Sequence, residues 1–129
     1  MGAGLTKILV VDDHDLVRMG IVRMLADIDG YQVVGDAKSG EEAVTKARIL
    51  KPDVVLMDVK MPGMGGLEAT KKLLTVNPVI KIIAVTACDD DLYPTRLMQA
   101  GAVGYVTKGA EFTEITDAIN KVIRGDLYM

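Results

Sequence analysis

Five polar residues with complementary chemistry stand at the ends of short apolar runs of the sequence. They are three carboxylates, one hydroxyl and one amine: Asp12, Asp13, Asp58, Thr86 and Lys108. Two carboxylates about 4 Å apart repel each other by roughly 4 kcal/mol at an effective dielectric constant near 20, so a cluster of three needs a cation or a shared proton. Oxygen ligands in a shallow, wet site favour Mg²⁺. If these residues meet, they suit the binding of a divalent cation and a phosphoryl group, with Lys108 as a point charge.

The apolar runs have the composition of buried strands, and segments with helical spacing separate them. The expected strands are Lys7–Val11, Gln32–Asp36, Val54–Met57, Lys81–Val85 and Gly104–Thr107. Alternating strands and helices predict one α/β domain: a doubly wound, five-stranded parallel sheet with helices on both faces. Ligands of such sheets bind beyond the carboxyl ends of the strands, where the strand order reverses. We expect the five polar residues along this edge.

Several features predict the helices between these strands. Ser39 and Glu42 form a capping box at the start of the second helix. The third helix is expected at about Leu67–Val76, and the fourth at about Leu92–Gln99, where Pro94 fits only in the first turn. The first and fifth helices each carry an apolar face. The first face is Val17, Ile21, Met24, Leu25 and Ile28, and the second is Phe112, Ile115, Ala118, Ile119, Val122 and Ile123.

The composition is that of an acidic globular domain. The 129 residues carry a formal net charge of −3 and have a pI near 5.1. Nucleic-acid-binding domains are usually basic, so we expect no such binding by this segment. No apolar stretch approaches the roughly 20 residues of a membrane span, and no secretory signal precedes the first strand. The single Cys88 cannot form an intrachain disulfide. These features predict a cytoplasmic protein without membrane contact.

Each polar residue also has an ordinary explanation when it is considered alone. Asp12 and Asp13 could cap the first helix, and an acidic residue such as Asp58 at a strand end is common turn chemistry. Lys108 alone is a typical solvated surface lysine. The conjunction on four strand ends favours the functional interpretation. His14 is the only histidine, which excludes a histidine-rich metal site, and we interpret it as a residue of the first helical turn.

Four stretches of the sequence form a highly specific combination. They are residues 10–13 (Val-Val-Asp-Asp), 58–62 (Asp-Val-Lys-Met-Pro) with Gly66, 85–87 (Val-Thr-Ala) and 105–108 (Tyr-Val-Thr-Lys). Along essentially the whole chain, this pattern resembles the receiver domain of bacterial two-component response regulators. Residues 11–18 with 108–110 resemble its NarL/FixJ family, and within it residues 58–63 and 94–97 resemble the GacA and UvrY global regulators. The resemblance implies a flavodoxin-like sheet with the strand order 2-1-3-4-5.

The resemblance also implies a phosphoacceptor and a metal site. Asp58 would accept a phosphoryl group in a phosphorelay, from a sensor histidine kinase or its phosphotransfer domain. Asp13, Asp58 and the backbone carbonyl of Lys60 would ligate Mg²⁺, and Asp12 would act through a metal-bound water. The chain would not be an enzyme beyond self-phosphorylation from a phosphodonor and autodephosphorylation.

Further residues take roles in switching by the same resemblance. Lys108 would pair with the phosphoryl group, Thr86 would move toward it, and Tyr105 would change rotamer as the readout. A new dianionic group would thereby bias a two-state arrangement of the surface around the fourth helix and fifth strand. Lys60 and Cys88 occupy the positions that tune the lifetime of the aspartyl phosphate in the family.

The output and the partners also follow from the resemblance. Residues 1–129 would be the receiver domain of a transcription regulator whose carboxy-terminal helix-turn-helix, absent here, binds DNA. Phosphorylation could promote a homodimer. The exposed face of the first helix, with Arg18 and Arg23, or the fifth helix with the fifth strand could carry this contact.

Three other interpretations deserve comparison. A haloacid-dehalogenase-like phosphatase would use Asp13 as its nucleophile, with Thr86 and Lys108 in supporting roles. That fold needs an acidic pair on a strand end after the lysine, and this sequence offers only Glu111 and Glu114 on a helix. A receiver that docks partners without phosphate would not need the complete set of acids, hydroxyl and amine. A nucleotide-binding Rossmann domain lacks support because no Gly-x-Gly-x-x-Gly follows the first strand.

Overall fold

The computed structural model describes residues 5–59, 61, 63–86, 92–107 and 112–128. Their strands form one five-stranded sheet in the order β2-β1-β3-β4-β5, and every neighbouring pair is parallel. The predicted fold class and strand order are therefore confirmed. The elements are β1 (Thr6–Val11), α1 (Asp15–Ala26), β2 (Tyr31–Ala37), α2 (Gly40–Leu50), β3 (Val54–Asp58), α3 (Gly66–Val76), β4 (Lys81–Thr86), α4 (Leu92–Gln99), β5 (Gly104–Thr107) and α5 (Phe112–Ile123).

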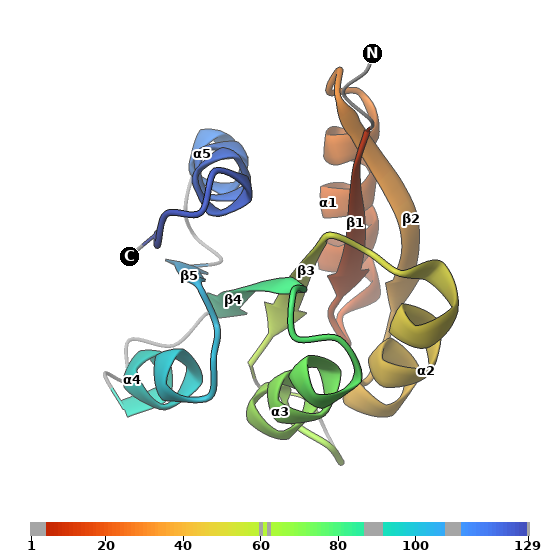
Figure 1. Cartoon of the computed structure of the whole chain (residues 1–129). Coiled ribbons are helices and arrows are strands. Elements are labelled where there is room, and N and C mark those ends of the chain that lie inside the picture. Colours follow the sequence, from red (N-terminus) through yellow and green to blue (C-terminus); the bar gives the residue numbers. More distant parts are fainter. Residues whose placement is uncertain (1–4, 60, 62, 87–91, 108–111, 129) are drawn as a thin grey trace.

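The helices cover both faces of the sheet, with α1 and α5 on one face and α2, α3 and α4 on the other (Figure 1). Successive strand residues point to opposite faces. In β1, Leu9 packs into the core beneath α2, α3 and α4, whereas Ile8 packs into the core beneath α1 and α5. All five residues of β3 are buried. A strand covered on both faces needs apolar residues at every position, which explains its continuous apolar run.

The first helix buries a different stripe from the predicted one. Leu25 is fully buried and Ile21 is partly buried, but Val17 and Met24 are 38% and 41% exposed. The helix ends at Ala26, so the predicted Ile28 lies in the following turn. The inward stripe begins one position later than Val17, because a charged side chain, that of Arg18, occupies the inward position of the first turn.

The second helix begins where the capping box predicts. The hydroxyl of Ser39 accepts a hydrogen bond from the Glu42 backbone N–H at 3.1 Å. The carboxylate of Glu42 reaches one residue further back than expected and accepts from the Lys38 backbone N–H at 2.6 Å. Both bonds satisfy donors at the amino end of the helix, which has no intrahelical acceptors for them.

Candidate functional site

The strand register brings the three predicted carboxylates and Thr86 to one edge of the sheet. Val11 of β1 pairs with Met57 of β3, so the two residues after Val11 lie beside the end of β3. Asp58 pairs with Val85 of β4, whose next residue is Thr86. Because all the strands are parallel, these carboxyl ends form a single edge.

Three carboxylates and an imidazole meet at this edge. Asp12, Asp13, His14 and Asp58 each offer one oxygen or nitrogen ligand atom, and these four atoms all lie within 4.8 Å of one another. Asp12 and Asp58 are each 2% exposed, whereas the side chain of Asp13 is 27% exposed. The sequence prediction that the acidic residues converge is therefore confirmed.

The loop between β1 and α1 folds tightly around this cluster. The Asp12 backbone N–H donates to the carbonyl of Ala37 at the end of β2, at 3.0 Å. The Asp12 carboxylate accepts from the His14 backbone N–H at 2.8 Å. Short acidic side chains commonly accept a backbone N–H two residues later in a turn, and this bond orients the Asp12 carboxylate.

His14 lies closer to the site than the sequence interpretation placed it. It is the residue before the first turn of α1, and its Nδ1 lies 3.3 Å from the Asp12 carboxylate and 3.2 Å from that of Asp13. An isolated histidine carries little information in a sequence. Its position directly after two strand-end aspartates was the signal that could have placed it at the site.

The cluster has the chemistry of a hard-cation site. Its oxygen donors are the carboxylates of Asp12, Asp13 and Asp58. The Oδ1 atom of Asp13 is buried and accepts no hydrogen bond from the described residues, although the His14 ring lies near it. Buried carboxylate oxygens without donors are costly unless a cation compensates for their charge. Clustered oxygen ligands of this kind fit Mg²⁺.

Arg18 is a correction to the sequence analysis, which placed it on the exposed face of the first helix. It is 5% exposed, and its guanidinium donates to the Asp12 carbonyl at 2.8 Å, to Asp15 at 2.7 Å and to Asp36 at 2.6 Å. Burial disfavours its charge, but the bonds to Asp15 and Asp36 outweigh this and raise the pKa of Arg18. The hydrogen bond from Arg18 and its positive charge hold the pKa of Asp15 below its usual value.

The predicted switch residues are described only in part. Thr86 is the last residue of β4 and is 2% exposed. Tyr105 of β5 is partly buried against the core beneath α2, α3 and α4, and it pairs in register with Ala84. Three other predicted residues lie outside the described part of the chain, namely Lys60, Cys88 and Lys108.

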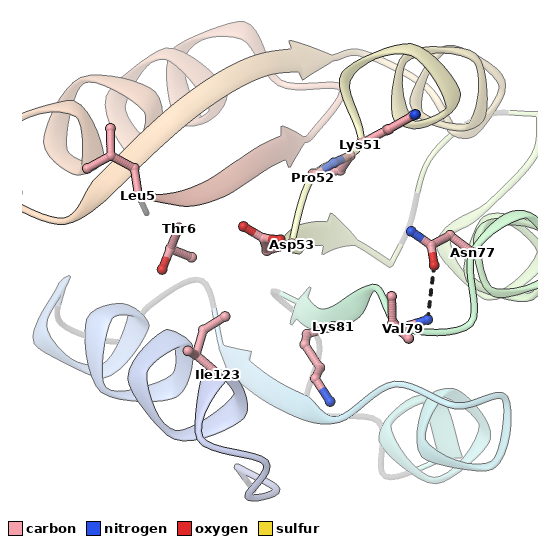
Figure 2. A pocket seen from close by; sticks show the side chains of 9 residues that line it. All are labelled: Leu5, Thr6, Lys51, Pro52, Asp53, Asn77, Val79, Lys81 and Ile123. Atoms are coloured by element: carbon pink, nitrogen blue, oxygen red, sulfur yellow. Dashed lines mark hydrogen bonds between the residues drawn. The ribbon is translucent and has the colours of Figure 1, made fainter. Parts of the chain in front are cut away.

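A hollow at the opposite edge of the sheet differs in chemistry from the acidic cluster. Figure 2 shows residues at or near the starts of three strands around it, including Thr6, Asp53 and Lys81, with Ile123 of α5 opposite. Asp53 is the acidic residue of this lining, and its carboxylate accepts the Lys7 backbone N–H at 2.9 Å. This carboxylate therefore has a structural role in joining β1 to the segment before β3.

Comparison with known proteins decides the family. The sequence pattern of the response regulator receiver domain family matches residues 8–120. The chain belongs to the response regulator receiver domain family. Response regulator GacA of Pseudomonas syringae pv. syringae strain B728a is 68% identical over 123 residues, which are 95% of this chain and 58% of that protein. Response regulator UvrY of Escherichia coli K12 is 50% identical over 123 residues, covering 95% of this chain and 56% of that protein.

Solved structures agree with this membership. A two-component response regulator of the LuxR family from Aurantimonas sp. SI85-9A1 matches with a TM-score of 0.93 and 35% identity, covering 98% of this chain and 90% of that chain. The signal receiver domain of NarL from Mycobacterium tuberculosis matches with a TM-score of 0.88 and 31% identity, covering 95% of this chain and 99% of that chain. The predicted resemblance to the GacA and UvrY group within the NarL-type regulators is confirmed.

Family membership settles two of the alternatives. The receiver domain is a signalling domain of two-component systems, so the chain is neither a haloacid-dehalogenase-like phosphatase nor a Rossmann dinucleotide-binding domain. Among the described residues, no helix combines the length and the apolar character that crossing a membrane requires.

Proposed function

We propose that the receiver domain accepts a phosphoryl group on Asp58 from the phosphohistidine of a sensor kinase or its phosphotransfer domain. The observation that carries this proposal is the position of Asp58: it ends β3, is 2% exposed, and has the ligand atoms of Asp12 and Asp13 within 4.8 Å. A carboxylate oxygen of Asp58 attacks phosphorus while the phosphorus–nitrogen bond of the donor breaks. The donor imidazole keeps the electron pair of that bond.

The acidic neighbours oppose this transfer unless their charge is offset. Asp13, Asp58 and the backbone carbonyl of Lys60 would hold Mg²⁺ in our proposal, and Asp12 would act through a metal-bound water. When bound, the ion neutralises charge on the transferring phosphoryl group and its carboxylate neighbours. The Asp13 Oδ1 atom, which accepts no hydrogen bond from the described residues, supports Asp13 as a ligand.

The response to phosphorylation is part of the same proposal. Lys108 pairs with the phosphoryl group, the hydroxyl of Thr86 moves toward it, and Tyr105 changes rotamer as the readout. Thr86 directly follows the β4 partner of Asp58, which supports its role. Lys60 and Cys88 tune the lifetime of the phosphate by controlling how water reaches it.

The curated relatives are longer than this chain. The chain spans 58% of the length of GacA from Pseudomonas syringae. We infer that residues 1–129 form the receiver domain of a cytoplasmic transcription regulator whose carboxy-terminal helix-turn-helix contacts DNA. Phosphorylation promotes a homodimer in this proposal, and the contact uses either the exposed part of α1 or α5 with β5.

The phosphoacceptor is tested by intact mass after incubation with Mg²⁺ and acetyl phosphate, followed by peptide mapping. We expect one phosphoryl group on Asp58, and none in Asp58→Asn. Asp29→Asn removes an exposed turn carboxylate and is the matched control, which should label like the wild type. Label on Asp13 in place of Asp58, or undiminished labelling of Asp58→Asn, would refute the assignment. Beryllium fluoride should shift the NMR signals of Tyr105 and α4 in the wild type and in Asp29→Asn, but not in Asp58→Asn.

A further inference from the structure

Arg18 is the one buried cation among the residues that the structure describes. It lies on the inward stripe of α1, in line with Leu25, at a position where an apolar residue is usual. Its guanidinium reaches three oxygens from three different segments: the Asp12 carbonyl, the Asp15 carboxylate and the Asp36 carboxylate. A rigid guanidinium fork suits such a junction, because its donors point in fixed directions.

The junction fixes the main chain at the acidic site from two sides. The Asp12 carbonyl accepts from Arg18 Nη1 at 2.8 Å, and the Asp12 N–H donates to the carbonyl of Ala37 at 3.0 Å. Asp36, the neighbour of Ala37, binds the guanidinium through its side chain, and its own carbonyl accepts from Lys46 of α2. The position of Asp12 is thus tied through Arg18 to α1, β2 and α2.

This tie matters because the three carboxylates of the cluster repel one another. The carboxylates of Asp12, Asp13 and Asp58 have ligand atoms within 4.8 Å of one another. Without a cation and without the tie to Arg18, the loop after β1 would lower this repulsion by moving its two carboxylates away from Asp58. A loop that relaxes in this way must be drawn back when an ion binds, which weakens the binding. A ligand set held in place beforehand does not incur that cost.

We propose that Arg18 is a positioning residue for the cation and phosphoryl site. By holding the Asp12 carbonyl, it keeps the carboxylates of Asp12 and Asp13 beside Asp58 in the ion-free protein, and Mg²⁺ affinity depends on it. The guanidinium donates to the Asp12 carbonyl and to the carboxylates of Asp15 and Asp36, which are not among the proposed ligands, so its effect passes through the loop. The proposal rests on the proposed function of the acidic cluster.

When Arg18 is replaced, a positioning role and a simple charge effect predict opposite changes in Mg²⁺ affinity. Removing a cation near a metal site strengthens the attraction of the site for Mg²⁺. Losing a second-layer partner that orients the ligands typically weakens metal affinity about 10- to 100-fold. Arg18→Met should therefore raise the Mg²⁺ dissociation constant about tenfold although it removes a positive charge. Arg18→Lys keeps the charge but not the fork, and it should weaken binding to nearly the same extent.

The experiment is a Mg²⁺ titration of the full chain, followed by amide NMR shifts without any phosphodonor. Arg23→Met is the matched control, because Arg23 is an exposed arginine of the same helix and Met replaces it identically. Its dissociation constant should stay within about twofold of the wild-type value, since exposed charges are screened. In ion-free Arg18→Met, the amide signals of residues 12–14 should broaden while the signals of α5 stay sharp.

The outcomes separate the two proposals. A wild-type chain that binds no Mg²⁺ overturns the proposed site and the role of Arg18 with it. If the wild type binds, unchanged or tighter binding by Arg18→Met, or wild-type binding by Arg18→Lys, overturns the positioning role alone. If Arg18→Met does not fold, Arg18→Lys tests the same junction, because it keeps the charge and removes the fork. Weaker Mg²⁺ binding by a folded Arg18→Lys variant supports the role.

Discussion

Replacing Gly66 with alanine should displace the main chain at Asp58 and lower both the stability of the domain and the rate at which Asp58 is phosphorylated. Gly66 is the first residue of α3, and its N–H donates to the Val59 carbonyl at 3.0 Å. A Cβ atom at this position would lie 2.5 Å from the Asp58 carbonyl oxygen and 2.9 Å from the Val59 Cα. Both opposing atoms belong to the main chain, so no side-chain rotation can relieve the contact.

The size of the effect follows from these distances. The contact with the Asp58 oxygen is 0.5 Å shorter than the 3.0 Å limit that real Cβ atoms observe. Overpacking of this kind costs typically about 1–3 kcal/mol. Alanine recovers less than about 1 kcal/mol of helix propensity, because the position is at the helix end. We expect a net loss of about 1–2 kcal/mol in the free energy of unfolding. For a domain of this size, that loss lowers the melting temperature by about 4–8 °C.

Gly65→Ala is the matched control, because the nearest atom to its Cβ would be the Val59 carbonyl oxygen at 3.6 Å, an ordinary contact. Urea unfolding measures the stability of both variants, and intact mass after acetyl phosphate measures their rates of phosphorylation. Gly66→Ala should lose stability and label more slowly at a temperature where it is fully folded, whereas Gly65→Ala should change little. A wild-type melting temperature and labelling rate for Gly66→Ala would refute the reasoning, as would equal losses in the control.

Three further predictions concern stability. Gly20 lies inside α1 with open space around its missing Cβ, so Gly20→Ala should raise the free energy of unfolding by about 0.5–1 kcal/mol; no gain in urea unfolding would contradict this. The buried Thr70 hydroxyl has no hydrogen-bond partner among the described residues, so Thr70→Val should stabilise by about 1 kcal/mol, and a lower melting temperature would reveal a partner. The hydrogen bond from the Lys38 backbone N–H lowers the pKa of Glu42 below its usual 4.5. This interaction contributes its full stability above that value, and the contribution is lost as the pH falls through the folded-state pKa of Glu42. The free energy of unfolding should therefore fall more steeply with decreasing pH in the wild type than in Glu42→Gln, and a parallel pH dependence of the two proteins would contradict this.

The sequence predicted the converging carboxylates because strand ends are encoded locally. A buried strand is a continuous apolar run, and the polar residue that ends it marks the sheet edge, as at Asp58. Parallel strands then bring such ends together without any further information, which is why Asp12 and Asp13 also appear beside it. The capping box at Ser39 was readable for the same reason, since its partners lie within four residues.

The role of Arg18 could not be predicted in this way. Patterns of apolar residues assign a charged side chain to the solvent, and this rule placed Arg18 on the exposed face in error. Its partners lie 3, 6 and 18 positions away in sequence, and the most distant, Asp36, comes near only when β2 pairs with β1. A buried cation is tolerated only where partners of this kind exist, and the sequence does not show which acidic residue the fold will bring there.

The side chains of the acidic cluster differ in exposure, and this difference decides which of them an incoming ion would meet first. Asp12 and Asp58 are each 2% exposed, Asp13 is 27% exposed, and the side chain of His14 is 65% exposed. A hydrated cation that bound here would therefore meet Asp13 before the two deeper carboxylates, and the exposed side of the site would leave room for the waters that Mg²⁺ prefers to keep. The deeper carboxylates cannot adjust freely to an incoming ion, because packed strand ends surround them. Their positions must be correct before the ion arrives, and at Asp12 the bond from Arg18 fixes the main chain that carries the carboxylate.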